Sequence, residues 1–320
     1  MKKTDVIALG ELLIDFTENG TSRQGNRLFE ANPGGAPCNV LAMLKNLGHE
    51  VAFIGKVGND FLGEELKTRV AGLGINTENL FQDQEIPTTL AFVHKKENGD
   101  RDFSFYRKPG ADMMLTEEEI DETSIANSKI FHFGTLSMTH DGVRRATLKA
   151  LEAAKKGHCI ISFDPNLRER LWDNLEDARE QVKTGLSYCD VLKISDNELQ
   201  WFTGEKDYSD GVAKLRKEYD IKLILVSMGK DGSRAYYNGT VVEANPFLQD
   251  HAVDMTGAGD TFYGCVLHYV LQWGLEGLKV GQLREMLTFA NAAASLITAR
   301  YGALCMMPTE KEVMEFMEAY

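Results

Sequence analysis

Three small residues followed by a carboxylate form the segment of this chain best suited to chemistry. Gly257, Ala258 and Gly259 precede Asp260, and an apolar helical pattern begins directly afterwards. Small residues at a helix start leave the first backbone N–H groups bare, and the helix dipole adds positive potential there, so such an end binds anions. A carboxylate beside it could accept a proton from a hydroxyl while a phosphoryl group rests on the amides. A plainer interpretation is also open, because Asp caps helices and Gly relieves strain in ordinary turns.

The composition is that of an acidic globular protein. Hydrophobic residues make up 43% of the 320 residues, and the formal net charge is −13. This excess of negative charge argues against nucleic acid or an anionic membrane as the main partner, but not against ATP, whose phosphates bind to amides and a few local cations. The first apolar run is too short for a signal peptide, and no segment approaches the ~18 apolar residues of a membrane span. We therefore expect a cytoplasmic protein.

Short apolar runs alternate with helical patterns along most of the chain. The runs predicted as buried strands are Val6–Gly10, Val51–Gly55, Ile130–Gly134, Cys159–Phe163, Val191–Ile194 and Lys222–Ser227. The predicted helices are Asn39–Leu47, Phe61–Ala71, Gly142–Lys156, Leu175–Leu186, Asp210–Tyr219, Thr261–Trp273, Gln282–Arg300 and one from Thr309 onward. This alternation predicts an α/β fold with a mainly parallel sheet covered on both faces. No linker or repeat divides residues 1–320, so we expect a single domain.

Two stretches break the alternation. Residues 12–32 have no helical period, and residues 88–108 contain β-rich runs on either side of Asn98-Gly99, a strong hairpin signal. Together they predict a small β structure outside the main sheet. A lid over an active site, an oligomer contact and a surface decoration are the three uses we consider for it.

Two signatures far apart in the chain resemble those of a known family. The segment Asp254-Met-Thr-Gly-Ala-Gly-Asp-Thr-Phe262 is similar to the C-terminal signature of the ribokinase-like (PfkB) carbohydrate kinases, and Asn32-Pro-Gly-Gly-Ala-Pro-Cys-Asn-Val40 resembles their N-terminal signature. Gly10-Glu-Leu-Leu-Ile-Asp-Phe16 and Phe163-Asp-Pro-Asn-Leu-Arg168 most resemble fructokinases. The resemblance covers essentially the whole chain. It implies a three-layer ribokinase-like sandwich with a β lid, and an ATP- and Mg²⁺-dependent phosphorylation of a primary hydroxyl, with D-fructose as the leading substrate.

The resemblance also implies roles for individual side chains. Asp260 would be the catalytic base, with Gly257, Ala258 and Gly259 as the anion hole. The residues implied in binding the sugar or the transferred phosphoryl group are Asp15, Gly34, Gly35, Asn39, Arg107 and Arg168. Those implied in binding ATP are Lys193, Glu198, Ser227, Gly229, Gly232 and Asn291, with Glu198 holding hydrated Mg²⁺. Those implied in holding a potassium ion are Asp254 and Thr256, next to the loop at 300–303.

One stretch departs from the usual pattern of the family. Before Glu198 the family commonly has Asn and a second acid, whereas this chain has Ser195 and Asp196 with Asn197 after them. Serine is a shorter hydrogen-bonding group than asparagine, so its part in ordering water around the metal is left open. The family resemblance further implies that the lid can join two copies in a homodimer.

Other substrates and functions remain open at this point. Arg107 and Arg168 could grip the carboxylate of 2-keto-3-deoxygluconate, although Asp15 would repel it. An aminoimidazole riboside is neutral on its ribose, so charge does not exclude it. A non-catalytic sugar-binding regulatory protein would have no reason to keep Asp260 beside an anion hole. A dinucleotide-dependent oxidoreductase would need a glycine-rich turn where this chain has Gly10-Glu-Leu-Leu-Ile-Asp, and P-loop and protein-kinase motifs are absent from the sequence.

Overall fold

A large, mostly parallel sheet forms the middle layer of the molecule. The computed structural model describes residues 4–95, 101–249 and 251–320. The strands of the main sheet are β1 (Thr4–Leu9), β4 (Val51–Gly58), β5 (Asn76–Asp83), β8 (Ser128–Gly134), β9 (Ile160–Asp164), β10 (Val191–Ser195), β11 (Leu223–Ser227), β12 (Ser233–Tyr237) and β13 (Thr240–Ala244). Their order is β13-β12-β11-β10-β9-β8-β1-β4-β5, with β12 antiparallel to both of its neighbours and the other pairs parallel.

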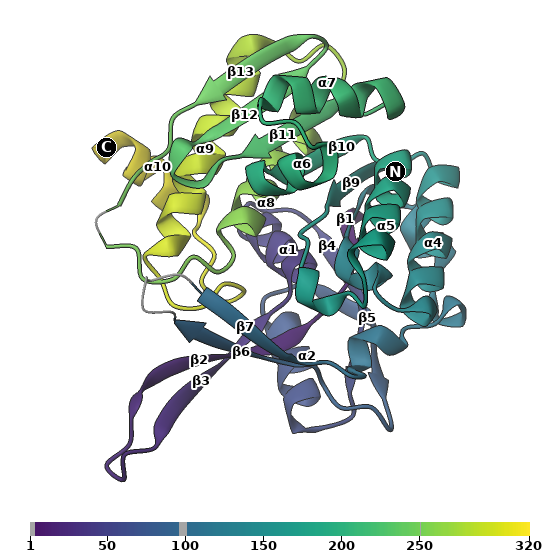
Figure 1. Ribbon diagram of the computed structural model, residues 1–320, viewed down its shortest axis with the longest axis vertical. Helices are drawn as coiled ribbons and strands as arrows, with labels where there is room; N and C mark the ends of the chain where they lie inside the picture. Colours follow the sequence, from purple (N-terminus) through teal and green to yellow (C-terminus); the bar gives the residue numbers. More distant parts are fainter. Residues whose placement is uncertain (1–3, 96–100, 250) are drawn as a thin grey trace.

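Helices cover both faces of this sheet (Figure 1). The helices on one face are α1 (Ala36–Asn46), α2 (Phe61–Gly72), α8 (Ala258–Trp273), α9 (Val280–Thr298) and α10 (Glu310–Ala319), and those on the other are α3 (Glu122–Ala126), α4 (Asp141–Lys156), α5 (Leu175–Tyr188), α6 (Asp196–Thr203) and α7 (Tyr208–Glu218). Alternate residues of β1 belong to the two layers: Val6 and Ala8 pack toward α1 and α8, whereas Ile7 and Leu9 pack toward α4 and α5. Burial on both faces explains why the strands are continuous apolar runs in the sequence.

A smaller sheet projects from this core and forms the lid. Its strands are β2 (Leu13–Thr21), β3 (Arg27–Gly34), β6 (Leu90–Lys95) and β7 (Arg101–Tyr106), in the order β3-β2-β6-β7. The predicted β lid is thus confirmed, with β6 and β7 antiparallel, while the predicted Asn98-Gly99 turn lies outside the described residues.

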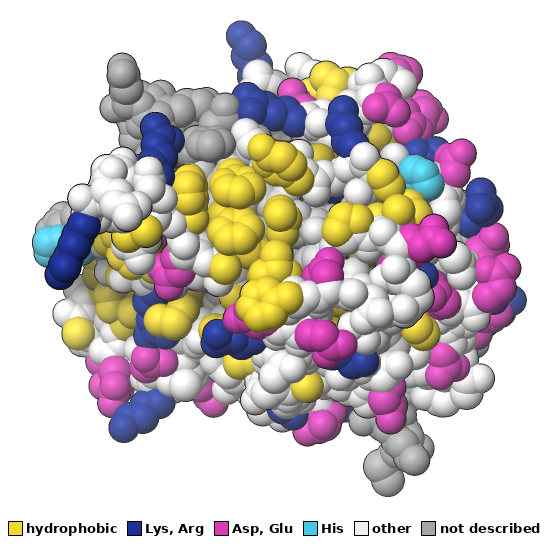
Figure 2. All heavy atoms as spheres, turned by 90° about the horizontal axis from the view of Figure 1, so that it is seen from below, with side chains coloured by type: hydrophobic (Ala, Val, Ile, Leu, Met, Phe, Trp, Pro, Cys, Tyr) yellow, Lys and Arg dark blue, Asp and Glu magenta, His cyan; other side chains and the backbone are white. Residues whose placement is uncertain are grey.

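Aromatic side chains gather on the lid. The ring of Phe92 stacks on Phe16 at 4.9 Å between centroids and meets Phe29 and Tyr106 edge-on at 5.4 Å. Phe29, Tyr106 and the neighbouring Leu28 are exposed. Figure 2, which views the molecule from below, shows hydrophobic side chains gathered in a band across that face. The lid therefore presents apolar surface to its surroundings.

The α/β alternation predicted from the sequence is confirmed, and the differences lie in short or edge elements. The sequence-based prediction misses β5, α3, α6, β12 and β13. β5 is an edge strand whose only fully buried residue is Leu80, so its hydrophobic pattern is weak. Within the three described ranges, no helix is both long and apolar enough to cross a membrane.

Candidate active site

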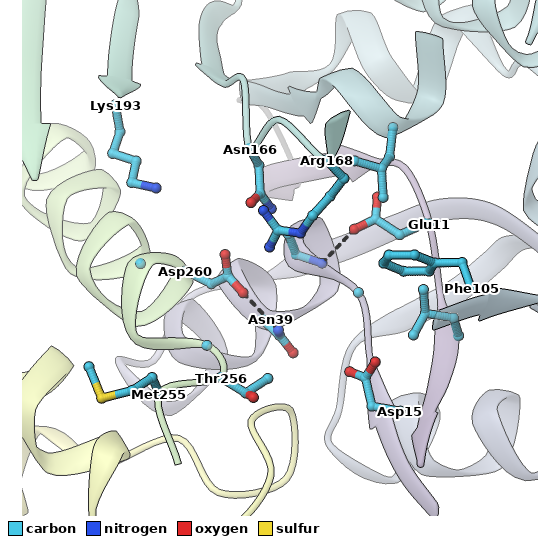
Figure 3. A pocket seen from close by; sticks show the side chains of 16 residues that line it. Glu11, Asp15, Asn39, Phe105, Asn166, Arg168, Lys193, Met255, Thr256 and Asp260 are labelled. Atoms are coloured by element: carbon cyan, nitrogen blue, oxygen red, sulfur yellow. Dashed lines mark hydrogen bonds between the residues drawn. The ribbon is translucent and has the colours of Figure 1, made fainter. Parts of the chain in front are cut away.

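A cavity of about 480 Å³ lies where strands of the main sheet end beneath the lid. In parallel sheets, ligands bind outside the carboxyl ends of the strands. The lid lines the cavity with Leu13, Asp15 and Phe105, and the core lines it with Glu11, Gly35, Ala36, Asn39, Leu136, Asn166, Arg168, Lys193, Met255, Thr256, Gly257, Gly259 and Asp260. Figure 3 shows how elements far apart in the sequence bring these side chains to one place.

The N-terminus of α8 opens onto this cavity. Gly257 precedes the helix with a φ of 78°, and a Cβ at this position would lie 2.5 Å from the Cβ of Ala303. Gly259 faces Lys193, whose Nζ would lie 3.1 Å from a Cβ at that position. The absence of these two side chains leaves the first N–H groups of the helix uncovered. Ala258 lies in the wall of a second cavity, so the three small residues lie together between the two spaces.

Asp260, in the first turn of α8, is buried, and among the described residues its carboxylate accepts a side-chain hydrogen bond from another helix. Its Oδ2 accepts a hydrogen bond of 2.8 Å from Nδ2 of Asn39 on α1, and the residue is 9% exposed. Burial raises the pKa of the Asp260 carboxyl, while the bond from Asn39 and the charges of Lys193 and Arg168 lower it in part. The Oδ1 of Asn39 is buried without a hydrogen-bond partner among the described residues. An unsatisfied acceptor beside a buried carboxylate suits a ligand that carries hydroxyl groups.

Lys193 places a positive charge next to the start of α8. Its Nζ forms a buried ion pair of 2.9 Å with Oδ2 of Asp164. Burial raises the pKa of Asp164 to about 6, and the carboxylates of Glu198 and Asp260 contribute to that rise. The pKa of Lys193 is raised because the surrounding carboxylates outweigh the effect of its burial. One ammonium group thus lies among three carboxylates, beside the bare helix end.

Glu198 lies outside the walls of both cavities. Its Oε2 accepts hydrogen bonds from the N–H and Oγ of Ser195, at 2.9 and 2.7 Å, in the capping box that begins α6. Its Oε1 accepts from the N–H of Leu167 at 2.7 Å. Glu198 therefore fixes the loop that carries Asn166 and Arg168, and its electrostatic effect reaches Lys193.

Asp15, Gly34 and Gly35 lie together where the lid strands β2 and β3 reach the cavity, with Gly34 as the last residue of β3. Asp15 lies in β2, opposite Asn32 of β3. A side chain at Gly34 would collide with the Asp15 carboxylate, and a side chain at Gly35, where φ is 137°, would collide with the backbone of Glu11. Gly34 does not line the cavity itself but leaves room for Asp15, whereas Gly35 does line it.

The second cavity, of about 260 Å³, lies on the other side of the α8 N-terminus. It contains the predicted nucleotide residues Ser227, Gly229, Gly232 and Asn291, and it shares Met255 and Gly259 with the first cavity. The amide of Asn291 is engaged: Nδ2 donates to the carbonyl oxygens of Ala244 and Asn245, and Oδ1 accepts from Ser233. The two cavities meet at residues 255–259, where the anion hole was predicted.

Arg107 and Arg168, predicted together, have different surroundings. Arg168 lines the first cavity, and Figure 3 shows its guanidinium pointing toward Asp260. Arg107 is 4% exposed and does not line the cavity. Its Nε donates to Asp112 at 2.7 Å, and its two terminal nitrogens donate to Thr139 and to the carbonyl oxygen of Leu136 at 2.8 and 3.0 Å. Contrary to the implied role, the structure does not bring Arg107 to the wall of the first cavity, because these partners hold its guanidinium within the protein.

Asp254 and Thr256 are the residues predicted to hold potassium. The carboxylate of Asp254 connects the segment before α8 with the loop at 300–303. The carboxylate of Asp254 accepts from the N–H of Thr256 at 2.7 Å and from the N–H of Gly302 at 3.1 Å. The structure thus joins the segment before the anion hole to the loop at 300–303. Thr256 also lines the first cavity.

Several residues in the cavity walls have no predicted role. Glu11, Phe105, Leu136 and Asn166 line the first cavity, and Asp164 pairs with Lys193 behind it. The signal that could have found most of them is their position, because Glu11, Leu136 and Asn166 are each the second residue after the end of a strand of the parallel sheet.

Comparison with known proteins places the chain in a family. The chain matches the family described as pfkB family carbohydrate kinase over residues 3–310. It is 38% identical to the protein named probable fructokinase-2 of Arabidopsis thaliana, over 98% of this chain and 95% of that one. The solved structure of an ATP-bound fructokinase from Xylella fastidiosa has a TM-score of 0.90 at 30% identity, covering 100% of this chain and 99% of that one.

A second solved structure contains a sugar. It is a double-mutant fructokinase from Vibrio cholerae O395 with bound fructose, ADP and potassium, and it has a TM-score of 0.88 at 26% identity over 99% of both chains. The resemblance first seen in two short signatures therefore extends across the whole chain. The protein belongs to the pfkB family of carbohydrate kinases.

Proposed function

We propose that this kinase transfers the γ-phosphoryl group of ATP to a primary hydroxyl of D-fructose, giving fructose 6-phosphate. The observation that carries the proposal is the position of Asp260. This buried carboxylate lies at a bare helix N-terminus, where a cavity of about 480 Å³ meets one of about 260 Å³. Small-molecule sites commonly measure roughly 300–1,000 Å³, so a sugar in the first space and part of a nucleotide in the second is a reasonable occupancy.

In this mechanism Asp260 accepts the proton of the sugar hydroxyl while its oxygen attacks the γ-phosphorus in line. The bond to the β-phosphate oxygen breaks, and ADP leaves. The N–H groups at residues 257–260 stabilise the charge of the transferring group, and Lys193 and Arg168 add positive charge on either side. A raised pKa suits Asp260 to this task, because a weaker acid is a stronger base.

The residues present fit a hydrated magnesium ion. Asp164, Glu198 and Asp260 surround the single ammonium of Lys193, so the region has unbalanced negative charge. Among the described residues, no group of three or more His, Cys, Asp and Glu side chains is placed to hold a metal ion directly. Magnesium loses its waters reluctantly, so the ion would contact ATP phosphates and water, with Asp164 and Glu198 nearby. Bound there, magnesium would neutralise phosphate charge during the transfer.

The choice of fructose is supported by the relatives and by the charges in the cavity. The similar proteins from Arabidopsis thaliana and Xylella fastidiosa carry the name fructokinase, and the Vibrio cholerae structure holds fructose. With Arg107 bound to Asp112, Arg168 is left as the arginine in the cavity wall. A substrate such as 2-keto-3-deoxygluconate would be favoured if two arginines bound its carboxylate. The position of Arg107 does not support that arrangement. An aminoimidazole riboside stays the second candidate, because a neutral ribose would also suit Asp15 and Asn39.

The exposed aromatic surface of the lid supports self-association of two copies. Phe29 and Tyr106 offer apolar area that a homodimer would bury. Sedimentation of the wild type and of Tyr106→Glu tests this: a dimer that the charge dissociates agrees with the proposal, and a monomeric wild type contradicts it.

One panel of assays tests the proposed reaction. ADP formation with ATP and Mg²⁺ is measured over fructose and other hexoses, ribosides and keto acids. We expect fructose to give the highest kcat/KM, and Asp15→Ala to raise its KM. A riboside or keto acid that clearly exceeds fructose would overturn the substrate, and no sugar-dependent ADP formation with any of them would favour a regulatory sugar-binding protein.

A further inference from the structure

Two chain segments that join the lid to the core lie against each other at the edge of the sugar cavity. Residues 10–12 lead from β1 into β2, and residues 34–36 lead from β3 into α1. Leu13 and Gly34, where these lid strands meet the core, are partners in the β2–β3 register. Any movement of the lid relative to the core must therefore bend the chain at these two segments.

Glu11 links the two segments. Its Oε1 accepts a hydrogen bond of 2.7 Å from the N–H of Ala36, the first residue of α1, and the residue is 5% exposed. The backbones are also in tight contact: a Cβ at Gly10 would lie 2.5 Å from Cγ of Pro37, and a Cβ at Gly35 would collide with the carbonyl oxygen of Glu11. The carboxyl group of Glu11 thus bridges the two segments, which can lie this close together because Gly10 and Gly35 have no side chains.

Each segment leads directly to groups that face the sugar cavity. Asp15 follows residues 10–12 in β2, and Asn39 follows residues 34–36 in the first turn of α1. Asn39 in turn donates to Asp260 at 2.8 Å. A shift between the two segments would therefore change the distance from Asp15 on the lid to Asn39 and Asp260 in the core.

We propose that Glu11 is a positioning residue for phosphoryl transfer. Through its hydrogen bond to Ala36 it holds residues 10–12 against the start of α1. This contact fixes the position of Asp15 relative to Asn39 and Asp260. The kinetic consequences rest on the proposed function, whereas the hydrogen bond does not. A misplacement of about 1 Å can cost roughly a hundredfold in rate. A loosened joint would also admit water, which would attack the γ-phosphorus and release ADP and inorganic phosphate without sugar phosphate.

This role requires an acceptor oxygen rather than a negative charge. Burial raises the pKa of Glu11 to about 7, Asp112 contributes to the rise, and the charge of Arg107 and the bond from Ala36 oppose it. The protonated and ionised carboxyl both offer an oxygen to the N–H of Ala36. Glutamine offers the same oxygen at the same reach, aspartate is one methylene shorter, and alanine has none.

These differences define the test. Glu11→Gln, Glu11→Asp and Glu11→Ala are compared with the wild type and with Glu30→Ala, a matched control at an exposed glutamate of the lid strand β3. Three quantities are measured: KM and kcat for fructose and for ATP, the ratio of ADP to sugar phosphate formed, and hydrogen exchange of the peptide spanning residues 34–41. Thermal unfolding shows whether each variant is folded.

We expect Glu11→Ala and Glu11→Asp to lower kcat/KM for the sugar by roughly 10- to 100-fold, with little change in KM for ATP. The ratio of ADP to sugar phosphate should rise above that of the wild type, and exchange in residues 34–41 should quicken. Glu11→Gln and Glu30→Ala should stay close to the wild type in all three measurements. If Glu11→Ala does not fold, Glu11→Asp and the exchange data decide the question.

Two results would overturn the proposal. A Glu11→Gln variant as impaired as Glu11→Ala would mean that Glu11 acts by its charge or by touching the sugar. If Glu11→Ala and Glu11→Asp change neither the ratio of ADP to sugar phosphate nor the hydrogen exchange of residues 34–41, the hydrogen bond to Ala36 does not position the lid. A wild type that phosphorylates no sugar would refute the proposed function alone, since the exchange experiment needs no substrate.

Discussion

Asn39→Ala removes the hydrogen bond that holds the carboxylate of Asp260 in place. The bond joins two buried side chains on α1 and α8, with 2.8 Å between Nδ2 of Asn39 and Oδ2 of Asp260. In the proposed mechanism Asp260 has to be ionised to accept a proton, so the rate should fall as the pH drops through its pKa. Burial raises that pKa and the bond from Asn39 lowers it. Removal of the bond therefore raises the pKa of Asp260, and the acid side of the rate profile should move to higher pH.

The size of the effect follows from the charge on the acceptor. A hydrogen bond to a charged group contributes about 1.5–3 kcal/mol. In Asn39→Ala only the ionised form of Asp260 loses this energy. On the acid side of the pH profile, the fraction of enzyme with Asp260 ionised should therefore fall by roughly 10- to 100-fold. At alkaline pH Asp260 is ionised again, so much of the loss should recover there.

The assay is kcat/KM for the sugar as a function of pH in wild type, Asn39→Ala and Asn39→Asp. The aspartate variant is nearly isosteric and places a second carboxyl group beside Asp260, so its acid side should move further than that of Asn39→Ala. If the acid side of the kcat/KM profile lies at the wild-type pH in both variants, the bond from Asn39 does not set the pKa of the base. A uniform loss at every pH would lead to the same conclusion, since it would indicate lost sugar contacts only.

Three further outcomes follow from the same geometry. Gly257→Ala should lose stability and turnover together, because its backbone is left-handed with φ 78° and the new methyl would lie 2.5 Å from Cβ of Ala303; unchanged turnover and unfolding temperature would contradict this. Arg107→Met should lower the free energy of unfolding, measured with urea, by about 3–5 kcal/mol, because it leaves Asp112 buried without its cation. A loss below about 1 kcal/mol, the contribution of an exposed ion pair, would count against this prediction. Potassium should raise the rate over a bulky organic cation at equal ionic strength, by ordering the loops that Asp254 joins; equal rates would remove the predicted site.

The fold and the small residues at the N-terminus of α8 could be predicted because both depend on residues that are close together in the sequence. Continuous apolar runs identify strands buried on two faces, and Gly257 to Asp260 are neighbours in the chain. The capping role of Glu198 could also have been predicted, since Ser195 and Glu198 have the spacing of a capping box. The family resemblance implied only a role near magnesium for Glu198, and the structure adds that its two oxygens accept hydrogen bonds from Ser195 and Leu167.

The surroundings of Glu11 and Arg107 could not be predicted in this way. Glu11 meets Ala36 only because the lid strands β2 and β3 return the chain to the same place, 25 residues later. Arg107 meets Asp112 across a short stretch that has no hydrophobic period, and it meets Leu136, 29 residues later in the chain, through tertiary packing. Such contacts depend on tertiary packing, and a charge near a predicted site gives no sign of whether it faces the ligand or the protein.

Asp260→Asn tests most directly whether Asp260 is the base of a phosphoryl transfer at the α8 N-terminus. Asparagine keeps the size of the side chain and leaves the helix N–H groups in place, but it cannot take the proton. Loss of a general base commonly costs about 10²–10⁴ in rate. We predict that kcat for fructose falls by this factor while the dissociation constant for ATP, measured by calorimetry, stays close to that of the wild type. Turnover at the wild-type rate in Asp260→Asn would contradict the account.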